Sequence, residues 1–206
     1  MDKVFISHSS RDVETVNKIQ RALGNAGITP LLAEFEQNTI PPYEKIDRMM
    51  NEAQSVFLLL TENVKFSDYT QNWISYEVGL ARGLGKDVCV FQKQGSYIIF
   101  PIPYLTDFFL YNPLYAKTWE ELKKKTSNLS PSHVLGRAIV AELLGCTSAP
   151  HGIIISALTS ISITEDKKKI FPIKRLVCHV CGIRFNYYGE ERYFNCPSCC
   201  SQIEII

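Results

Sequence analysis

The chain has 206 residues, a formal net charge of +1, and a composition that is 46% hydrophobic and 21% charged. This composition excludes an intrinsically disordered or collagen-like chain, and the near-neutral charge argues against unspecific binding to nucleic acid or to an anionic membrane. The longest apolar run, Val56–Leu60, is too short to span a bilayer. No signal peptide is visible, so we expect a cytoplasmic protein.

The first 150 residues alternate between short apolar runs and helical patterns. Ser9 and Asp12 stand at the spacing of a capping box, which predicts the start of a helix that ends near Gly24. Further helices are predicted at Tyr43–Ala53, Asn72–Leu84 and Ser132–Leu144. Strands are predicted at Val4–Ser7, Ile28–Leu32, Ser55–Leu60, Asp87–Gln92 and Tyr104–Tyr111.

This alternation predicts an α/β fold with a parallel five-stranded sheet that is covered on both faces. Ligands of such sheets bind beyond the carboxyl ends of the strands. We therefore expect three segments to lie near one rim: the loops after the first and second strands and the start of the helix Asn72–Leu84.

Four cysteines near the C-terminus form two C-x2-C pairs, Cys178 with Cys181 and Cys196 with Cys199. Two such pairs supply the four thiolates that Zn2+ prefers, and the segment resembles a zinc ribbon. A rubredoxin-like iron site uses similar turns and stays an alternative, whereas a redox C-x-x-C needs a helix N-terminus that we do not predict here. Cys200 is either a substitute ligand or a bystander.

Four ligands leave no open coordination position, so we expect a structural metal that contributes most of the folding energy of this small segment. Between the ribbon and the α/β part, Ser156–Ile163 alternates apolar and hydroxyl residues and predicts a strand. The predicted organisation is a domain at 1–145, a linker at 146–175 and a zinc ribbon at 176–206.

Trp73 and Glu77 are four residues apart and therefore share one face of the predicted helix. A carboxylate on an otherwise apolar stripe is costly unless it has a partner. Glu77 either pairs with a basic residue or a helix N-terminus at the edge of the stripe, or lies in a cleft beside an aromatic wall.

Two segments of the chain resemble TIR domains of the bacterial and archaeal type. The run Val4–Asp12, with the sequence VFISHSSRD, resembles the opening strand and loop of that family, and Trp73–Glu77 matches its W-x-x-x-E pattern. The loop Gln37–Lys45 stands where the family has its BB loop. The resemblance covers roughly residues 1–145 and implies a flavodoxin-like TIR domain.

The resemblance also implies an activity, because many such domains cleave NAD+ into nicotinamide and ADP-ribose or a cyclic isomer, often in signalling against phage. It gives Glu77 the catalytic role and makes NAD+ the substrate. It further implies self-association, since a neighbouring subunit completes the active site in many members. The residues that it places at the substrate are Ser9, Ser10, Arg11, Lys45, Trp73 and Tyr76.

Two other functions stay open at this stage. One is a TIR module without catalysis that assembles with other TIR domains. The other is a relative that binds nucleotides or transfers N-ribosyl groups, with a substrate other than NAD+. Fold-level similarity does not separate these three functions.

Overall fold

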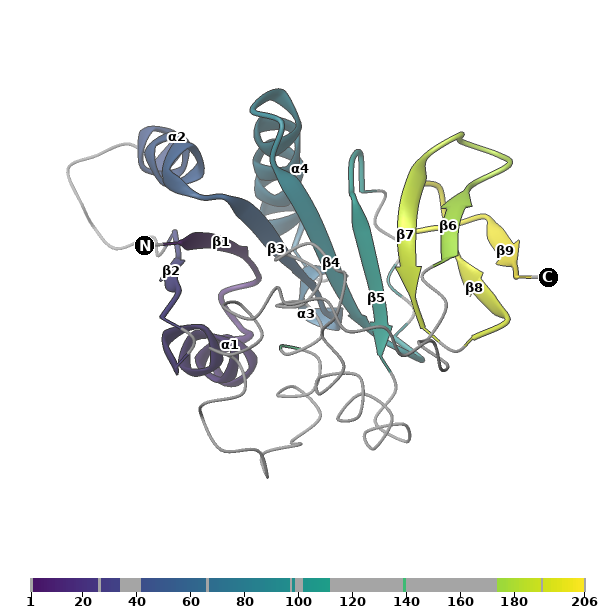
Figure 1. Cartoon of the computed structure of the whole chain (residues 1–206), viewed down its shortest axis with the longest axis horizontal. Helices are drawn as coiled ribbons and strands as arrows, with labels where there is room; N and C mark the ends of the chain where they lie inside the picture. The colour runs from purple at the N-terminus through teal and green to yellow at the C-terminus, as the bar shows by residue number, and fades with distance from the viewer. Residues whose placement is uncertain are drawn as a thin grey trace, which may run out of the picture.

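The structure is a computed structural model of the whole chain (Figure 1). It describes residues 2–25, 27–33, 42–65, 67–96, 98, 102–111, 139, 174–189 and 191–205. The predicted strand Ser156–Ile163 lies outside these residues. So does the predicted helix Ser132–Leu144, apart from Ile139, which is helical and buried.

A seven-stranded sheet forms the centre of the molecule. Its strands are β1 Lys3–Ser7, β2 Thr29–Leu31, β3 Ser55–Leu60, β4 Asp87–Lys93, β5 Asp107–Tyr111, β6 Lys174–Val177 and β7 Arg184–Tyr188. The order across the sheet is β2-β1-β3-β4-β5-β7-β6, and every neighbouring pair is parallel except the antiparallel pair of β6 and β7. The five predicted parallel strands are therefore confirmed, and two further strands extend their sheet.

The helices cover both faces of this sheet. They are α1 Val13–Asn25, α2 Pro42–Glu52, the short α3 Glu62–Lys65, and α4 Asp68–Gly83. Figure 1 shows α1 on one side of the sheet and α2 and α4 on the other. Among the described residues, each helix is too short or too polar to cross a membrane.

The alternation of side chains along β1 divides the core into two parts. Val4 and Ile6 pack against α1, whereas Phe5 packs with the apolar residues of α2 and α4. All six residues of β3 are buried, because a central parallel strand has no face in water. By the same alternation, Ser7 at the end of β1 lies on the face of Phe5, toward α4.

The helix α4 begins four residues before the predicted start at Asn72. Ser67 has an extended backbone, and its side chain accepts a hydrogen bond from the backbone N–H of Thr70 at 3.2 Å. This N-cap starts the helix at Asp68. The first turn has no buried apolar side chain, so apolar periodicity in the sequence does not reveal it.

The C-terminal segment joins the central sheet. Its strand β7 pairs in parallel with β5, and β6 pairs with β7 at the edge of the sheet. The last two strands, β8 Tyr193–Asn195 and β9 Gln202–Glu204, pair with each other in a separate antiparallel sheet.

Aromatic side chains hold β7 against the rest of the sheet. Phe91, Phe109 and Tyr188 stand in register on three neighbouring strands. Their rings are stacked, with centroid distances of 4.9 Å between the first two and 4.3 Å between the last two. On the opposite face, Tyr187 of β7 stacks on Phe194 of β8 at 4.3 Å. The C-terminal strands therefore share the core of the sheet.

A buried carboxylate marks the junction between β5 and β7. Asp107 is 1% exposed and accepts hydrogen bonds from Asn186 and Tyr188 of β7, each at 3.2 Å. Thr106 donates to it at 2.9 Å. These donors compensate for the loss of water around the charge, and two of them come from the C-terminal segment.

We predict that Asp107→Ala lowers the free energy of unfolding by about 2 to 4 kcal/mol, because it leaves the buried Tyr188 hydroxyl and Asn186 amide without their acceptor. Urea denaturation measures this change. The exposed Asp2 provides a matched control, and Asp2→Ala should change the stability by less than about 0.5 kcal/mol. Equal effects of the two substitutions would contradict the structural role of Asp107.

Candidate functional site

A buried glutamate lies where β1 ends against α4. Glu77 is 6% exposed, and its Oε2 accepts a hydrogen bond from the Ser7 hydroxyl at 2.5 Å. Among the described residues, Ser7 is the hydrogen-bond partner of this carboxyl group, and no basic side chain pairs with it. The sequence left open whether Glu77 pairs with a basic partner at the edge of the apolar stripe or lies in a cleft. In the structure its carboxyl group is buried, and no described basic side chain pairs with it.

Two opposing effects set the protonation of Glu77. Burial raises its pKa to about 7 from an ordinary value of 4.5, and the hydrogen bond from Ser7 acts in the lowering direction. A carboxyl group with a pKa near 7 exchanges between its neutral and charged forms around neutral pH, as acids and bases at active sites do.

Three aromatic side chains follow one another along α4. The rings of Tyr69 and Trp73 meet edge to face at 6.0 Å, and those of Trp73 and Tyr76 at 5.8 Å. The spacing of three and four residues places them on neighbouring turns of the helix. Trp73 is therefore held from both sides, one turn before Glu77.

A cavity of about 560 Å³ opens beside these residues. Glu77 and Trp73 line it from α4, His8 and Ser10 from the loop after β1, and Leu32 and Ala33 from the end of β2. The cavity thus lies at the carboxyl ends of β1 and β2, as expected for a parallel α/β sheet. Its volume is in the range of sites for small ligands. We call it the Glu77 cavity.

The predicted substrate contacts fall into two groups. Ser10 and Trp73 line the Glu77 cavity, whereas Ser9, Arg11, Lys45 and Tyr76 are not among its lining residues. Ser9 is buried, and its hydroxyl accepts from the backbone N–H of Arg11 at 3.4 Å. The Tyr76 hydroxyl donates to Asp47 of α2 at 2.5 Å. The roles of all six residues stay predictions.

Sequence reasoning missed Ser7 and His8. Both stand in the run that resembles TIR domains, and His8 directly follows the first strand, where a ligand is expected. Ser7 could have been found from its position two residues after Phe5, because this spacing places its hydroxyl on the face of the sheet that α4 covers.

The predicted capping box at the start of α1 is wrong, although the helix does start there. The Asp12 carboxylate accepts hydrogen bonds from Thr61 at 2.7 Å and from Asn63 at 2.6 Å. Asp12 therefore ties the loop after β1 to the segment after β3, and fixes the loop that carries His8 and Ser10.

The four cysteines of the two C-x2-C pairs come together. The Sγ atoms of Cys178, Cys181, Cys196 and Cys199 all lie within 4.8 Å of one another. The Sγ atoms of Cys178 and Cys199 are 3.6 Å apart, and those of Cys181 and Cys196 are 3.8 Å apart. Thiolates at about 2.3 Å around one tetrahedral ion have nearly this separation, so the residues fit a metal of the zinc type.

Each pair of cysteines lies in a tight turn. The N–H of Gly182 donates to the carbonyl of Cys178, and the N–H of Cys200 donates to the carbonyl of Cys196, both at 2.9 Å. Gly182 and Cys200 occupy equivalent positions and both have positive φ, 72° and 61°. Cys200 is thus the residue after the second turn, held in a conformation that favours glycine, and it is not one of the four clustered cysteines.

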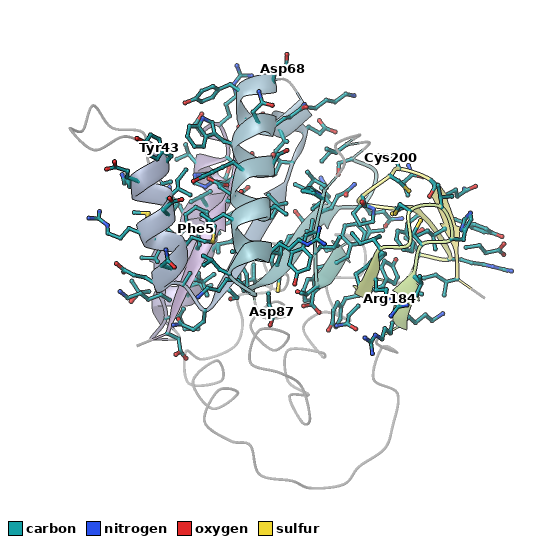
Figure 2. All side chains as sticks on the ribbon, turned by 90° about the horizontal axis from the view of Figure 1, so that it is seen from above. Phe5, Tyr43, Asp68, Asp87, Arg184 and Cys200 are labelled. Atoms are coloured by element: carbon teal, nitrogen blue, oxygen red, sulfur yellow. The ribbon has the colours of Figure 1, made fainter. Side chains whose placement is uncertain are left out.

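The cysteine cluster and the Glu77 cavity are separate. Figure 2 shows Cys200 in the C-terminal strands, to the side of α4, whose first residue Asp68 is labelled. The cluster can hold a metal ion, with no open position for a substrate, and the Glu77 cavity is the candidate for chemistry.

Comparison with known proteins gives a family match in the N-terminal part of the chain. The TIR domain family matches residues 4–91. No curated protein is similar enough in sequence to match the chain.

Two solved structures are distantly similar. A 2-desoxiribosyltransferase from Leishmania mexicana is 15% identical with a TM-score of 0.36, and the match covers 44% of this chain and 64% of the transferase. The TIR domains in the activated Roq1 resistosome, which directly recognises the pathogen effector XopQ, are 10% identical with a TM-score of 0.39. That match covers 77% of this chain and 98% of the other. Neither similarity carries an argument about activity.

We predict about one zinc ion per chain and its loss in Cys196→Ser, because the substitution removes a ligand and destabilises the C-terminal strands. Metal analysis together with thermal denaturation measures both effects. Cys200→Gly is the matched control. It should keep the metal and raise the stability by about 1 kcal/mol, because glycine adopts a positive φ without strain. Full metal content in Cys196→Ser would contradict the ligand set.

We also predict that Glu77 makes the stability depend on pH. Its pKa is 4.5 in the unfolded chain and about 7 in the folded protein, so the folded protein keeps a proton that the unfolded chain releases. The contribution of Glu77 to the free energy of unfolding is therefore fully present below pH 4.5. It falls as the pH rises from 4.5 to about 7, by about 3 kcal/mol in total.

The variant Glu77→Gln should lack this loss. Urea denaturation at about pH 5 and about pH 8 should show the variant gaining stability over the wild type at the higher pH. The exposed Glu62 of α3 provides the control, because Glu62→Gln should follow the wild-type curve. Parallel curves for Glu77→Gln and the wild type would exclude a raised pKa.

Proposed function

We propose that this chain, whose residues 4–91 match the TIR domain family, cleaves the bond between nicotinamide and ribose in NAD+. The products are nicotinamide and either ADP-ribose or a cyclic isomer. The family includes members that cleave NAD+ and members that act as adaptors, so the proposal needs support from the site itself. The observation that carries it is the buried Glu77 carboxyl group in the wall of a cavity of about 560 Å³.

The chemistry of the bond suits this arrangement. The bond between ribose C1 and the nicotinamide nitrogen breaks, and its electron pair neutralises the positive nitrogen, so the leaving group needs no strong acid. Positive charge develops on the ribose, as in other glycosidic cleavages, and a nearby carboxylate stabilises it. Water then adds at C1 and releases a proton, or a nucleophile of the same molecule closes the ring.

We assign Glu77 the role of that carboxylate. Burial strengthens the attraction between the charged carboxylate and the positive charge that develops on the ribose, because little water screens the two charges from each other. Ser7 is a positioning residue in this proposal. Its hydroxyl holds one carboxyl oxygen at 2.5 Å and favours the charged form.

The Glu77 cavity also offers a surface for the planar rings of the substrate. Trp73 lines the cavity and is fixed between Tyr69 and Tyr76 by edge-to-face contacts. An indole face attracts a cationic ring such as the nicotinamide of NAD+. Ser10 and His8 line the cavity from the loop after β1 and are the nearest polar candidates for the ribose hydroxyls.

The adaptor function stays as the second candidate. It rests on the family alone, and so does the prediction that the chain associates with itself. Measuring nicotinamide release over a range of protein concentrations separates the two functions, because an adaptor releases none at any concentration.

We predict that Glu77→Gln lowers nicotinamide release by about 10²- to 10⁴-fold, because it removes the charge that stabilises the developing cation. Chromatography of the reaction with NAD+ measures the product. Glu62→Gln, which changes an exposed carboxyl group of α3, should keep the wild-type rate. Wild-type turnover by Glu77→Gln would exclude the catalytic role.

The pH profile tests the same site in a second way. The charged form of Glu77 is the active one, so the rate of nicotinamide release should rise with pH around a pKa of about 7. Ser7→Ala removes the hydrogen bond that lowers this pKa, and should therefore move the rise to higher pH. A profile of Ser7→Ala that is scaled down but not shifted would assign Ser7 a purely structural role.

A further inference from the structure

Ser201 contacts one sulfur atom from each of the two C-x2-C pairs. Its Oγ lies 3.0 Å from the Sγ of Cys199 and 3.3 Å from the Sγ of Cys178. These two sulfur atoms are 3.6 Å apart. A single hydroxyl group therefore joins the first pair to the second, and the spacing of the cysteines does not reveal it.

The backbone around the second pair fixes the position of this hydroxyl group. Cys200, which has a φ of 61°, follows the turn, and β9 begins at Gln202. Between them, the carbonyl of Ser201 accepts a hydrogen bond from the N–H of Cys196 at 2.8 Å. Ser201 is thus tied to the first cysteine of the second pair, and its short side chain reaches the sulfur atoms from a fixed place.

The sulfur atoms need hydrogen-bond donors when the cluster holds a divalent ion. The four thiolates carry four negative charges, of which such an ion neutralises two. Cys178 and Cys196 are buried, so water does not fully solvate the remaining charge. The backbone N–H of Ser198 donates to the Sγ of Cys196 at 3.4 Å. A thiolate has no proton to give, so the Ser201 hydroxyl is the donor in its own contacts.

We propose that Ser201 is a positioning residue of the metal centre, whose hydroxyl donates to the thiolate of Cys199 and shares this hydrogen bond with Cys178. The four cysteines hold the ion, and Ser201 acts through two of them. It draws negative charge away from their sulfur atoms and holds the two C-x2-C pairs against each other. Partners of this kind behind the ligands typically contribute about 10- to 100-fold to metal affinity. The proposal does not depend on the cleavage of NAD+.

Cobalt substitution tests this role through the electrons of the sulfur atoms. Co2+ binds to the same kinds of ligand as Zn2+, and thiolates bound to it absorb light by charge transfer. A hydrogen bond lowers the energy of the sulfur electrons. Its loss in Ser201→Ala should therefore shift the sulfur-to-cobalt absorption of the full chain to longer wavelength. Competition with a chelator should show zinc binding about 10- to 100-fold weaker than in the wild type.

Two further variants separate the hydroxyl group from the rest of the turn. Ser198→Ala is the matched control, because the hydrogen bond of Ser198 to Cys196 comes from the backbone N–H, which alanine keeps. It should leave the absorption and the zinc affinity unchanged. Ser201→Thr keeps a hydroxyl group at the proposed position and should retain the wild-type absorption and affinity.

Four results overturn the proposal: a full chain that takes up neither zinc nor cobalt, wild-type absorption and affinity in Ser201→Ala, weaker zinc binding in Ser201→Ala without a shift of the absorption, or the same shift in Ser198→Ala. The third result would give Ser201 a purely structural role. If Ser201→Ala does not fold, Ser201→Thr decides. Wild-type absorption and affinity in Ser201→Thr then support the hydrogen bond, and their loss overturns it.

Discussion

The hydrogen bond between Ser7 and Glu77 is the interaction on which the candidate site depends. It joins a strand residue to a helix residue, Ser7 of β1 and Glu77 of α4. Ser7 follows Phe5 by two residues and so shares its face of the strand, and Glu77 follows Trp73 by four residues and so shares its face of the helix. Burial alone favours the neutral acid, and the hydroxyl favours the charged carboxylate. The balance puts the pKa of Glu77 at about 7, where a small change in the surroundings changes the charge of the group.

Much of the α/β fold could be predicted from the sequence. The strands β1, β3 and β4 are short apolar runs and lie within one residue of their predicted bounds. The docking of β7 beside β5 could not be predicted, because the cysteine spacing indicates a self-contained ribbon. Nothing in the local pattern shows that Phe109 and Tyr188, which are separated by 78 intervening residues, come into register.

The candidate site was likewise predictable only where local spacing brings its residues together. Helical spacing identified Trp73 and Glu77 as neighbours, and the cysteine spacing identified the cluster that the structure brings together. Ser7 was missed because a serine at the end of an apolar strand looks like the strand's boundary. Asp12 was assigned to the helix start on local spacing, whereas its partners Thr61 and Asn63 are distant in sequence.

The parallel pairing of β5 with β7 connects the segment of the four clustered cysteines to the edge of the central sheet. Without the C-terminal strands, β5 would be the border of the sheet, with unpaired backbone groups and the aromatic rings of Phe108 and Phe109 beside it. Such borders recruit strands from other molecules and start aggregation. The order of the C-terminal segment, which carries the four clustered cysteines, therefore also decides whether β5 has a neighbouring strand or is open to strands of other molecules.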